Sequence, residues 1–218
     1  MSPRSKGLLH VVAIVLNVVL AVAYPLAVWF ALARYSPRVV GILVAAAIVP
    51  LMVLRHRNAP REHLWAVMRI PLVIVAVLGA GIAFDDARFL LMIPVLINAG
   101  LLITFASSLG AEMPIVERFA RMQEPELSDA KQRHCRQATL AWCAFFFANG
   151  TAAAALALAA PVSWWATYNG GIAYALIGLM FVAEYVVRKY RFRDYGRAPH
   201  DRLLAVLFPP RGERRGET

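Results

Sequence analysis

Residues 89–110 of the chain are "FLLMIPVLINAGLLITFASSLG", and this stretch contains no charged side chain. An α-helix rises about 1.5 Å per residue, so about 20 apolar residues in succession can cross the hydrocarbon core of a bilayer. A helix on the surface of a soluble protein would also need a polar face, which this stretch lacks. The stretch therefore predicts a membrane-spanning helix.

The rest of the chain has the same character. Of its 218 residues, 60% are hydrophobic and 17% are charged, whereas soluble domains contain roughly 45–50% and 25%. The predicted fold is therefore all-α, a polytopic membrane helix bundle with six transmembrane helices. We expect one transmembrane domain over residues 1–195 and a basic cytoplasmic tail over residues 196–218. The expected spans are residues 8–33, 36–54, 64–84, 89–110, 137–160 and 164–187.

The distribution of Lys and Arg indicates how these spans are oriented. If both termini are cytoplasmic, the inner segments hold nineteen of the 23 basic residues, and the outer loops hold only Arg34, Arg38 and Arg88. Cytoplasmic loops of membrane proteins are enriched in Lys and Arg. The sequence therefore predicts a multi-pass membrane protein with both termini in the cytoplasm. The same rule accounts for the net charge of +10, so we expect membrane lipids and not nucleic acid as a partner.

The longest charged segment is "AEMPIVERFARMQEPELSDAKQRHCR", residues 111–136, which we expect to be the main cytoplasmic loop. Pro114 suits the start of a helix, where its missing N–H costs nothing, and Pro125 ends the helical pattern. Apolar residues at helical spacing predict a short amphipathic helix over residues 114–123, on the inner leaflet or on neighbouring loops. Its candidate docking residues are Glu117, Arg118, Phe119 and Arg121. The alternative is a solvated connector that only joins two spans.

Three motifs in the second half of the chain carry a resemblance to a known family. They are "FASSLGAEMPIVERFARMQEPEL" from residue 105, "RQATLAWCAFFFANG" from residue 136 and "AEYVVRKYRFRDY" from residue 183. Over residues 95–195 the chain resembles a family of small bacterial inner-membrane proteins, encoded beside the enzymes that make aryl-polyene and xanthomonadin-type pigments. The resemblance implies a role near fatty-acid-like synthases, acyl-activating ligases and acyltransferases. It assigns no catalytic residue.

Polar residues within the expected spans are informative, because each of them needs a partner in lipid. Three amides form a candidate polar interior: Asn17, Asn98 and Asn149. Hydrogen bonding between helices is one explanation for them, and a ligand site is the other. The three amides are neutral and no carboxylate joins them, which favours the first explanation.

Two charged residues, Arg69 and Glu184, also lie inside expected spans, at similar depth from the cytoplasmic side. They form a candidate intramembrane pair that faces the bundle interior and joins the third span to the sixth. Arg69 can instead extend its side chain to the interface. Glu184 can instead pair with Arg188, one turn along its own helix.

No motif in the sequence assigns a reaction. Cys135 and Cys143 lack the spacing of a zinc site, and the adjacent Asp85 and Asp86 fit a helix start better than a metal site. We expect no catalytic, cofactor-binding or metal-ligating residues. The expected function is an accessory or scaffold protein for the synthesis of a lipid-linked polyene or fatty-acid-like product, with an acyl carrier protein or soluble biosynthetic enzymes as partners. A transporter or flippase for such a product, and a membrane-bound acyl-modifying enzyme, are the alternatives.

Overall fold

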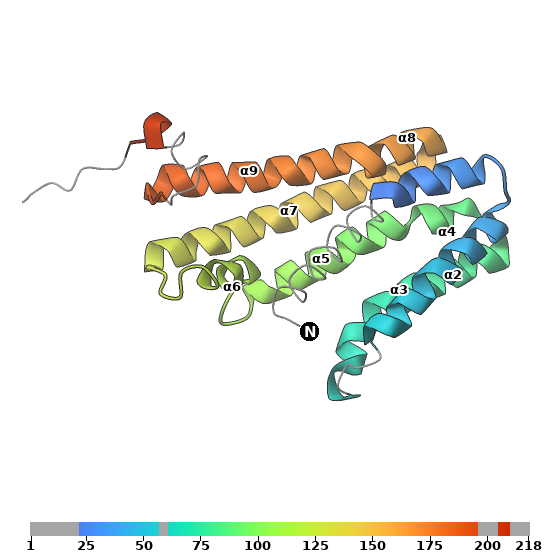
Figure 1. Ribbon diagram of the computed structural model, residues 1–218, viewed down its shortest axis with the longest axis horizontal. Helices are drawn as coiled ribbons and strands as arrows, with labels where there is room; N and C mark the ends of the chain where they lie inside the picture. The colour runs from blue at the N-terminus through green and yellow to red at the C-terminus, as the bar shows by residue number, and fades with distance from the viewer. Residues whose placement is uncertain (1–21, 57–60, 196–204, 210–218) are drawn as a thin grey trace, which may run out of the picture. The chain divides into compact units, whose positions relative to one another are not determined.

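The computed structural model describes residues 22–56, 61–195 and 205–209, and the side chains of residues 51–52, 54–56 and 61–71 lie outside this description. Every regular element among the described residues is helical, and none is a strand. A helical segment, Val22–Leu32, comes first. The α-helices labelled in Figure 1 follow it: α2 (Pro37–His56), α3 (Arg61–Phe84), α4 (Ala87–Leu91), α5 (Ile93–Leu109), α6 (Ile115–Arg121), α7 (Asp129–Ala159), α8 (Val162–Thr167) and α9 (Ala173–Phe192). A short π-helix, η1 (Tyr168–Ile172), lies between α8 and α9.

Three helical stretches are long and apolar enough to cross a membrane. They are Ala87–Leu109, which joins α4 to α5, the helix α7, and Val162–Phe192, which joins α8, η1 and α9. Within the described residues, the shorter apolar helices are Val22–Leu32, Pro37–Pro50 and Leu72–Phe84. The predicted all-helical membrane fold is confirmed at this level. The number of spans and the side on which the termini lie stay predictions.

Two of the helices differ in their bounds from the spans expected from hydropathy. The helix α7 begins at Asp129, so the polar residues 129–136 form its first turns before the apolar stretch begins. The stretch 89–110 is divided at Met92 between α4 and α5. Pro94 explains this division, because proline has no N–H to donate to the carbonyl four residues earlier.

The chain forms two compact units. Unit 1 comprises Met1–Ile103 and Phe145–Tyr174, and unit 2 comprises Thr104–Ala144 and Ala175–Thr218. The core of unit 1 contains two clusters of buried apolar residues: one is Val28, Leu91, Ala157, Trp165 and Ala166, and the other is Val40, Leu78, Leu90 and Ile93. Tyr24 packs against both clusters, so the segment Val22–Leu32 joins them.

Within unit 1, α2 and α3 lie side by side (Figure 1). Gly41 permits their close approach, because a Cβ atom at this position would lie 2.8 Å from Cγ1 of Ile82. Where α3 ends, Asp85 has a φ of 54°, and its carboxylate accepts a hydrogen bond of 2.7 Å from the backbone N–H of Arg38 at the start of α2. Asp86 caps α4 by accepting from the N–H of Arg88 at 2.9 Å. The helix-start role predicted for this acidic pair is confirmed.

In unit 2 the connection between α5 and α7 is folded onto these helices. The hydroxyl of Ser108 donates to the carbonyl of Phe105 and accepts from the N–H of Ile115, at 2.7 and 3.0 Å. Ala120, Leu127 and Cys135 form a small buried cluster against which Val116 packs. The segment between the two apolar helices is therefore an ordered part of unit 2, and α6 has a defined orientation in it.

Candidate functional site

Two of the three predicted amides meet in unit 1. Nδ2 of Asn149 donates to Oδ1 of Asn98 at 3.0 Å, and Nδ2 of Asn98 donates to the carbonyl of Pro94 at 2.8 Å. The hydroxyl of Tyr168 donates to Oδ1 of Asn149 at 2.8 Å. Both amides are buried, so these bonds satisfy polar groups that water does not reach. Asn17, the third predicted member, lies outside the described residues.

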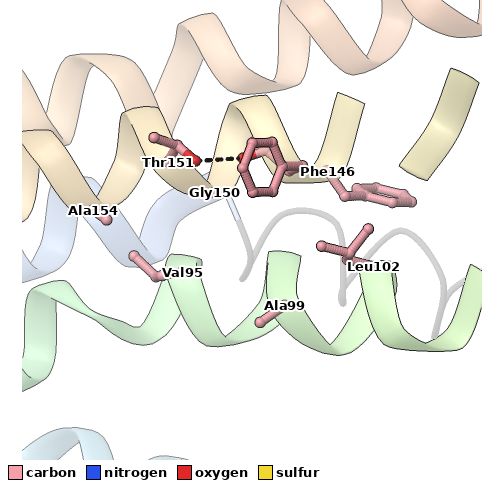
Figure 2. A pocket seen from close by; sticks show the side chains of 8 residues that line it. Val95, Ala99, Leu102, Phe146, Gly150, Thr151 and Ala154 are labelled. Carbon is pink, nitrogen blue, oxygen red and sulfur yellow. Dashed lines mark hydrogen bonds between the residues drawn. The ribbon is translucent and has the colours of Figure 1, made fainter. Parts of the chain in front are cut away.

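An apolar groove of about 260 Å³ runs beside these amides between α5 and α7 (Figure 2). Its lining is Val95, Ala99, Leu102, Phe146, Phe147, Gly150, Thr151 and Ala154. The hydroxyl of Thr151 donates to the carbonyl of Phe147 at 2.8 Å. Gly150 keeps the two helices close, because a Cβ atom there would lie 3.1 Å from the Cβ of Asn98. The groove can hold a hydrocarbon chain, and its lining offers no acid or base for catalysis.

The division between α4 and α5 frees carbonyl groups that distant side chains then bind. The hydroxyl of Tyr24 donates to the carbonyl of Leu90, and Nε1 of Trp165 donates to the carbonyl of Leu91, both at 2.9 Å. A backbone carbonyl without a partner is costly in a membrane interior. Pro94 was the only signal of this site in the sequence, and neither donor was predicted.

In unit 2, α6 carries the four predicted docking residues. Nε and Nη2 of Arg121 donate to Oε1 of Glu117, one turn earlier in the helix, at 2.9 and 2.7 Å. Nη1 of Arg121 also donates to the carbonyl of Pro125 at 3.0 Å. Arg118 is exposed, and its Nε donates to the carbonyl of Met113 at 3.1 Å. Arg121 thus closes α6 and the turn after it into one local structure.

The orientation of α6 could not be foreseen from its pattern. Glu117 and Ala120 are buried with 5% and 4% of their surface exposed, whereas Phe119 and Met122 are 59% and 80% exposed. The charged side of the helix therefore contains a buried carboxylate, and two large apolar side chains point away from unit 2. Val116 supplies the apolar contact inward, because it packs against the cluster around Cys135.

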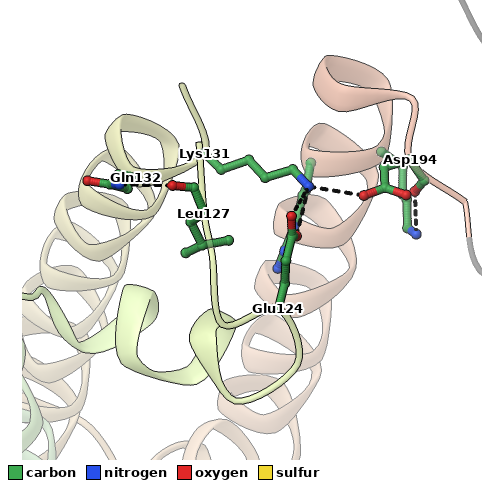
Figure 3. Close-up of polar contacts among 7 residues, drawn as sticks. Glu124, Leu127, Lys131, Gln132 and Asp194 are labelled. Atoms are coloured by element: carbon green, nitrogen blue, oxygen red, sulfur yellow. Dashed lines mark hydrogen bonds and ion pairs between the residues drawn. The ribbon is translucent and has the colours of Figure 1, made fainter. Parts of the chain in front are cut away.

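A network of ion pairs ties the chain after α6 to α7 and α9 (Figure 3). Nζ of Lys131 lies 2.7 Å from a carboxylate oxygen of Glu124 and 3.0 Å from Oδ2 of Asp194. Arg188 lies 3.8 Å from the other oxygen of Glu124. The side chain of Lys131 is only 15% exposed, so its bonds lie in a partly water-excluded site and hold the connection firmly.

Glu184 lies in unit 2 with a partner that the sequence did not indicate. Nε1 of Trp142, on α7, donates to Oε2 of Glu184 at 3.0 Å. The Trp142 ring is buried and lies 4.7 Å from the ring of Phe181, between centroids. The predicted partner Arg69 belongs to α3, and its side chain lies outside the described ones. The intramembrane pair therefore stays a prediction.

The described part of the chain holds no group of three His, Cys, Asp or Glu side chains placed to bind a metal ion. His134 and Cys135 are both buried, and Nε2 of His134 has no hydrogen-bond partner. The ring of His134 instead packs edge-on against Phe192, with centroids 5.4 Å apart. These neighbours on one helix offer packing and no nucleophile–base arrangement.

Comparisons of the chain with protein-family models, with curated proteins and with solved structures find no match. The resemblance noted above therefore stays a prediction.

Proposed function

We propose that the chain is a six-span accessory or scaffold protein of the bacterial inner membrane, with both termini in the cytoplasm. In this proposal it holds a soluble biosynthetic partner at the membrane during synthesis of a lipid-linked polyene or fatty-acid-like product. The observation that carries the proposal is the outward orientation of Phe119 and Met122 on α6.

Large apolar side chains that are exposed on a cytoplasmic connection favour the binding of a protein partner there. Burying one Phe or Met side chain contributes about 1.5–3 kcal/mol, and this contribution is available to any protein that covers α6. The helix α6 and the chain after it are also held in place before a partner binds. Arg121 donates hydrogen bonds to Glu117 and to Pro125, and Lys131 donates to Glu124. A preformed surface loses little conformational entropy when it binds.

The identity of the partner comes from the resemblance, which covers α6 and the helices on either side of it. Proteins of that family are expected beside fatty-acid-like synthases, acyl-activating ligases and acyltransferases. An acyl carrier protein or such a ligase, held at α6, would deliver a growing chain next to the bilayer into which the product passes.

Binding to the purified protein in nanodiscs tests this proposal. An acyl carrier protein and an acyl-activating ligase are titrated separately against wild type and against the Phe119→Ser variant. We expect one of them to bind, and the substitution to raise its Kd by about tenfold or more, the equivalent of one buried aromatic side chain. Gln123→Ser is the matched control, because Gln123 is exposed and polar, and it should leave Kd unchanged. Equal Kd values for wild type and Phe119→Ser would refute the docking role.

A transporter or flippase for the same product is a second candidate, supported by the groove between α5 and α7. A hydrocarbon chain lying in it would pass close to the amides Asn98 and Asn149, which can bind a polar group carried by that chain. Ala99→Trp would fill the groove, and Ala155→Trp places the same bulk on an exposed part of α7 outside the lining. If transport is the function, only Ala99→Trp should stop the product from reaching the outer leaflet while binding at α6 persists. Equal transport in both variants would exclude this candidate.

A further inference from the structure

The chain turns back where α9 ends. Arg193 has a φ of 54°, in the left-handed region, and its N–H donates to the carbonyl of Lys189 at 2.9 Å. Nζ of Lys189 donates to the carbonyl of Asp194 at 2.7 Å, and the Asp194 carboxylate pairs with Lys131 of α7. The left-handed residue ends the helix, and the ion pairs hold the turn against α7. The chain after α9 is therefore attached to unit 2 where it leaves the helix.

A second short segment packs on this turn. Residues 205–207 form one helical turn, and the ring of Phe208 packs edge-on against Tyr190 with centroids 5.2 Å apart. The Arg193 guanidinium carbon lies 4.9 and 5.1 Å from the centroids of the Tyr190 and Phe208 rings, a double cation–π contact. The hydroxyl of Tyr195 donates to the carbonyl of Phe208. We call residues 205–208, held by these contacts, the C-terminal foot.

The foot exposes aliphatic side chains where the apolar helix ends. Val206 and Leu207 are 81% and 69% exposed. The stretch Val162–Phe192, to which α9 belongs, is long and apolar enough to cross a membrane. Because the foot contacts Tyr190 and Arg193 at the end of this stretch, it lies next to the surface of any bilayer that the stretch crosses.

The charge of this part of the chain suits an anionic surface. From Arg188 to the C-terminus there are nine Lys and Arg residues and four Asp and Glu residues. Anionic lipid head groups attract such basic segments at the membrane surface. A short apolar segment or a basic segment alone binds a bilayer weakly, and the two together bind it stably.

We propose that the C-terminal foot is an anionic-lipid-binding anchor, which inserts Val206 and Leu207 into the leaflet at the α9 end, while basic residues of the sequence from Arg188 onward bind lipid phosphates. The nine Lys and Arg residues from Arg188 onward complement the negative charge of lipid phosphates. The foot also packs on the end of α9, a helix whose exposed residues, such as Leu179 and Val182, are apolar. Both observations favour lipid over a protein as its partner.

A fluorescent probe on the foot tests the proposal in the full chain. Cys135 and Cys143 are replaced by Ala, and a polarity-sensitive dye is attached at Leu207→Cys. The protein is reconstituted in phosphatidylcholine vesicles with and without phosphatidylglycerol, and quenching by acrylamide in the water is measured. We expect several-fold weaker quenching with phosphatidylglycerol, reversed by high salt because screening weakens the attraction to head groups. The same dye at Gln123→Cys, an exposed position on the connection after α6, should be quenched equally in both membranes.

Two further measurements distinguish lipid from protein as the partner that shields Leu207. Arg193→Gln removes the guanidinium between Tyr190 and Phe208, so the dye at position 207 should become accessible again in the anionic vesicles. Equal quenching at position 207 in both membranes would overturn the proposal. Shielding that increases with the ratio of protein to lipid would overturn it as well, because a second copy of the chain would then cover Leu207.

Discussion

A single proline determines which side chains are needed at the division between α4 and α5. In a continuous helix the N–H of residue 94 would bind the carbonyl of Leu90, and Pro94 has no N–H. Tyr24 binds this carbonyl through its hydroxyl at 2.9 Å. The Tyr24 hydroxyl and Pro94 are therefore coupled through one acceptor, although they lie far apart in the sequence.

This coupling predicts a specific pattern of stabilities. Tyr24→Phe should lower the free energy of unfolding by about 1–3 kcal/mol, the cost of leaving a buried acceptor unsatisfied. In a Pro94→Ala background the loss should be much smaller, because the new N–H can bind the carbonyl of Leu90. Unfolding in mixed detergent micelles measures both values, with Tyr35→Phe as the control at an exposed tyrosine. Equal losses in the two backgrounds would contradict the coupling.

The Asn98–Asn149 contact shows what can be inferred about single residues from a sequence. Each amide was expected to need a partner, because lipid offers none. That they bind each other, with Tyr168 as the next donor, depends on how α5, α7 and η1 are placed. The need for a partner is a property of the residue, whereas the choice of partner is a property of the packing.

At the scale of elements, α6 shows the same difference between what the sequence determines and what the packing determines. Its existence follows from Pro114, Pro125 and the helical spacing between them, and its observed bounds, Ile115–Arg121, lie within the expected ones. Its orientation does not follow, because burial of Glu117 depends on Arg121 and on the cluster around Cys135. Apolar periodicity identifies a face of a helix, and only the neighbouring helices decide whether that face is covered.

The buried carboxylate makes α6 sensitive to one substitution. Arg121→Gln removes the donors to Glu117 and weakens the link to Pro125, which should cost about 1–2 kcal/mol after allowance for the partial exposure of the guanidinium. Hydrogen exchange of the α6 amides should accelerate about tenfold for each 1.4 kcal/mol. Arg133→Gln, at an exposed position of α7, should leave that exchange unchanged. Unaltered exchange in Arg121→Gln would show that the pair does not hold α6 in place.

At the scale of the whole molecule, hydropathy predicted the class of fold because apolar helix length is a local property of the chain. The number of spans depends in part on residues 8–21, 57–60 and the region around them, where the structure describes little or nothing. The charge distribution favours an even number of spans, because an even number places both basic ends of the chain on the same side of the membrane.

Reporter fusions measure this topology directly. A reporter that is active only in the cytoplasm, fused after Thr218 or inserted within residues 124–130, should be active at both sites. The same reporter inserted between Asp86 and Arg88 should be inactive, because the predicted topology places that turn on the outer side. An inactive reporter after Thr218 would reverse the orientation of α9 and with it the cytoplasmic location proposed for α6.

The predicted pair of Arg69 and Glu184 would link α3 to α9 and so concerns the chain as a whole. Glu184 already accepts a hydrogen bond from Trp142, which satisfies one of its oxygens and leaves its charge to be balanced. Glu184→Gln keeps an acceptor for Trp142 and removes the charge. If Arg69 balances that charge, Glu184→Gln and Arg69→Gln should each lower the amount of folded protein in the membrane.

The exchanged variant, Arg69→Glu with Glu184→Arg, then separates a structural role from a functional one. An ion pair depends on the presence of opposite charges at the two positions, so the exchange should restore the folded amount relative to Arg69→Glu or Glu184→Arg alone. Recovery of product formation as well would show that the pair is a clamp between helices. Recovery of folded protein without product would show that the carboxylate or the guanidinium acts on a substrate at its own position. Single variants that match the wild type in both measurements would exclude the pair, and the extension of Arg69 to the interface would then explain its charge, because a long side chain can reach water from that depth.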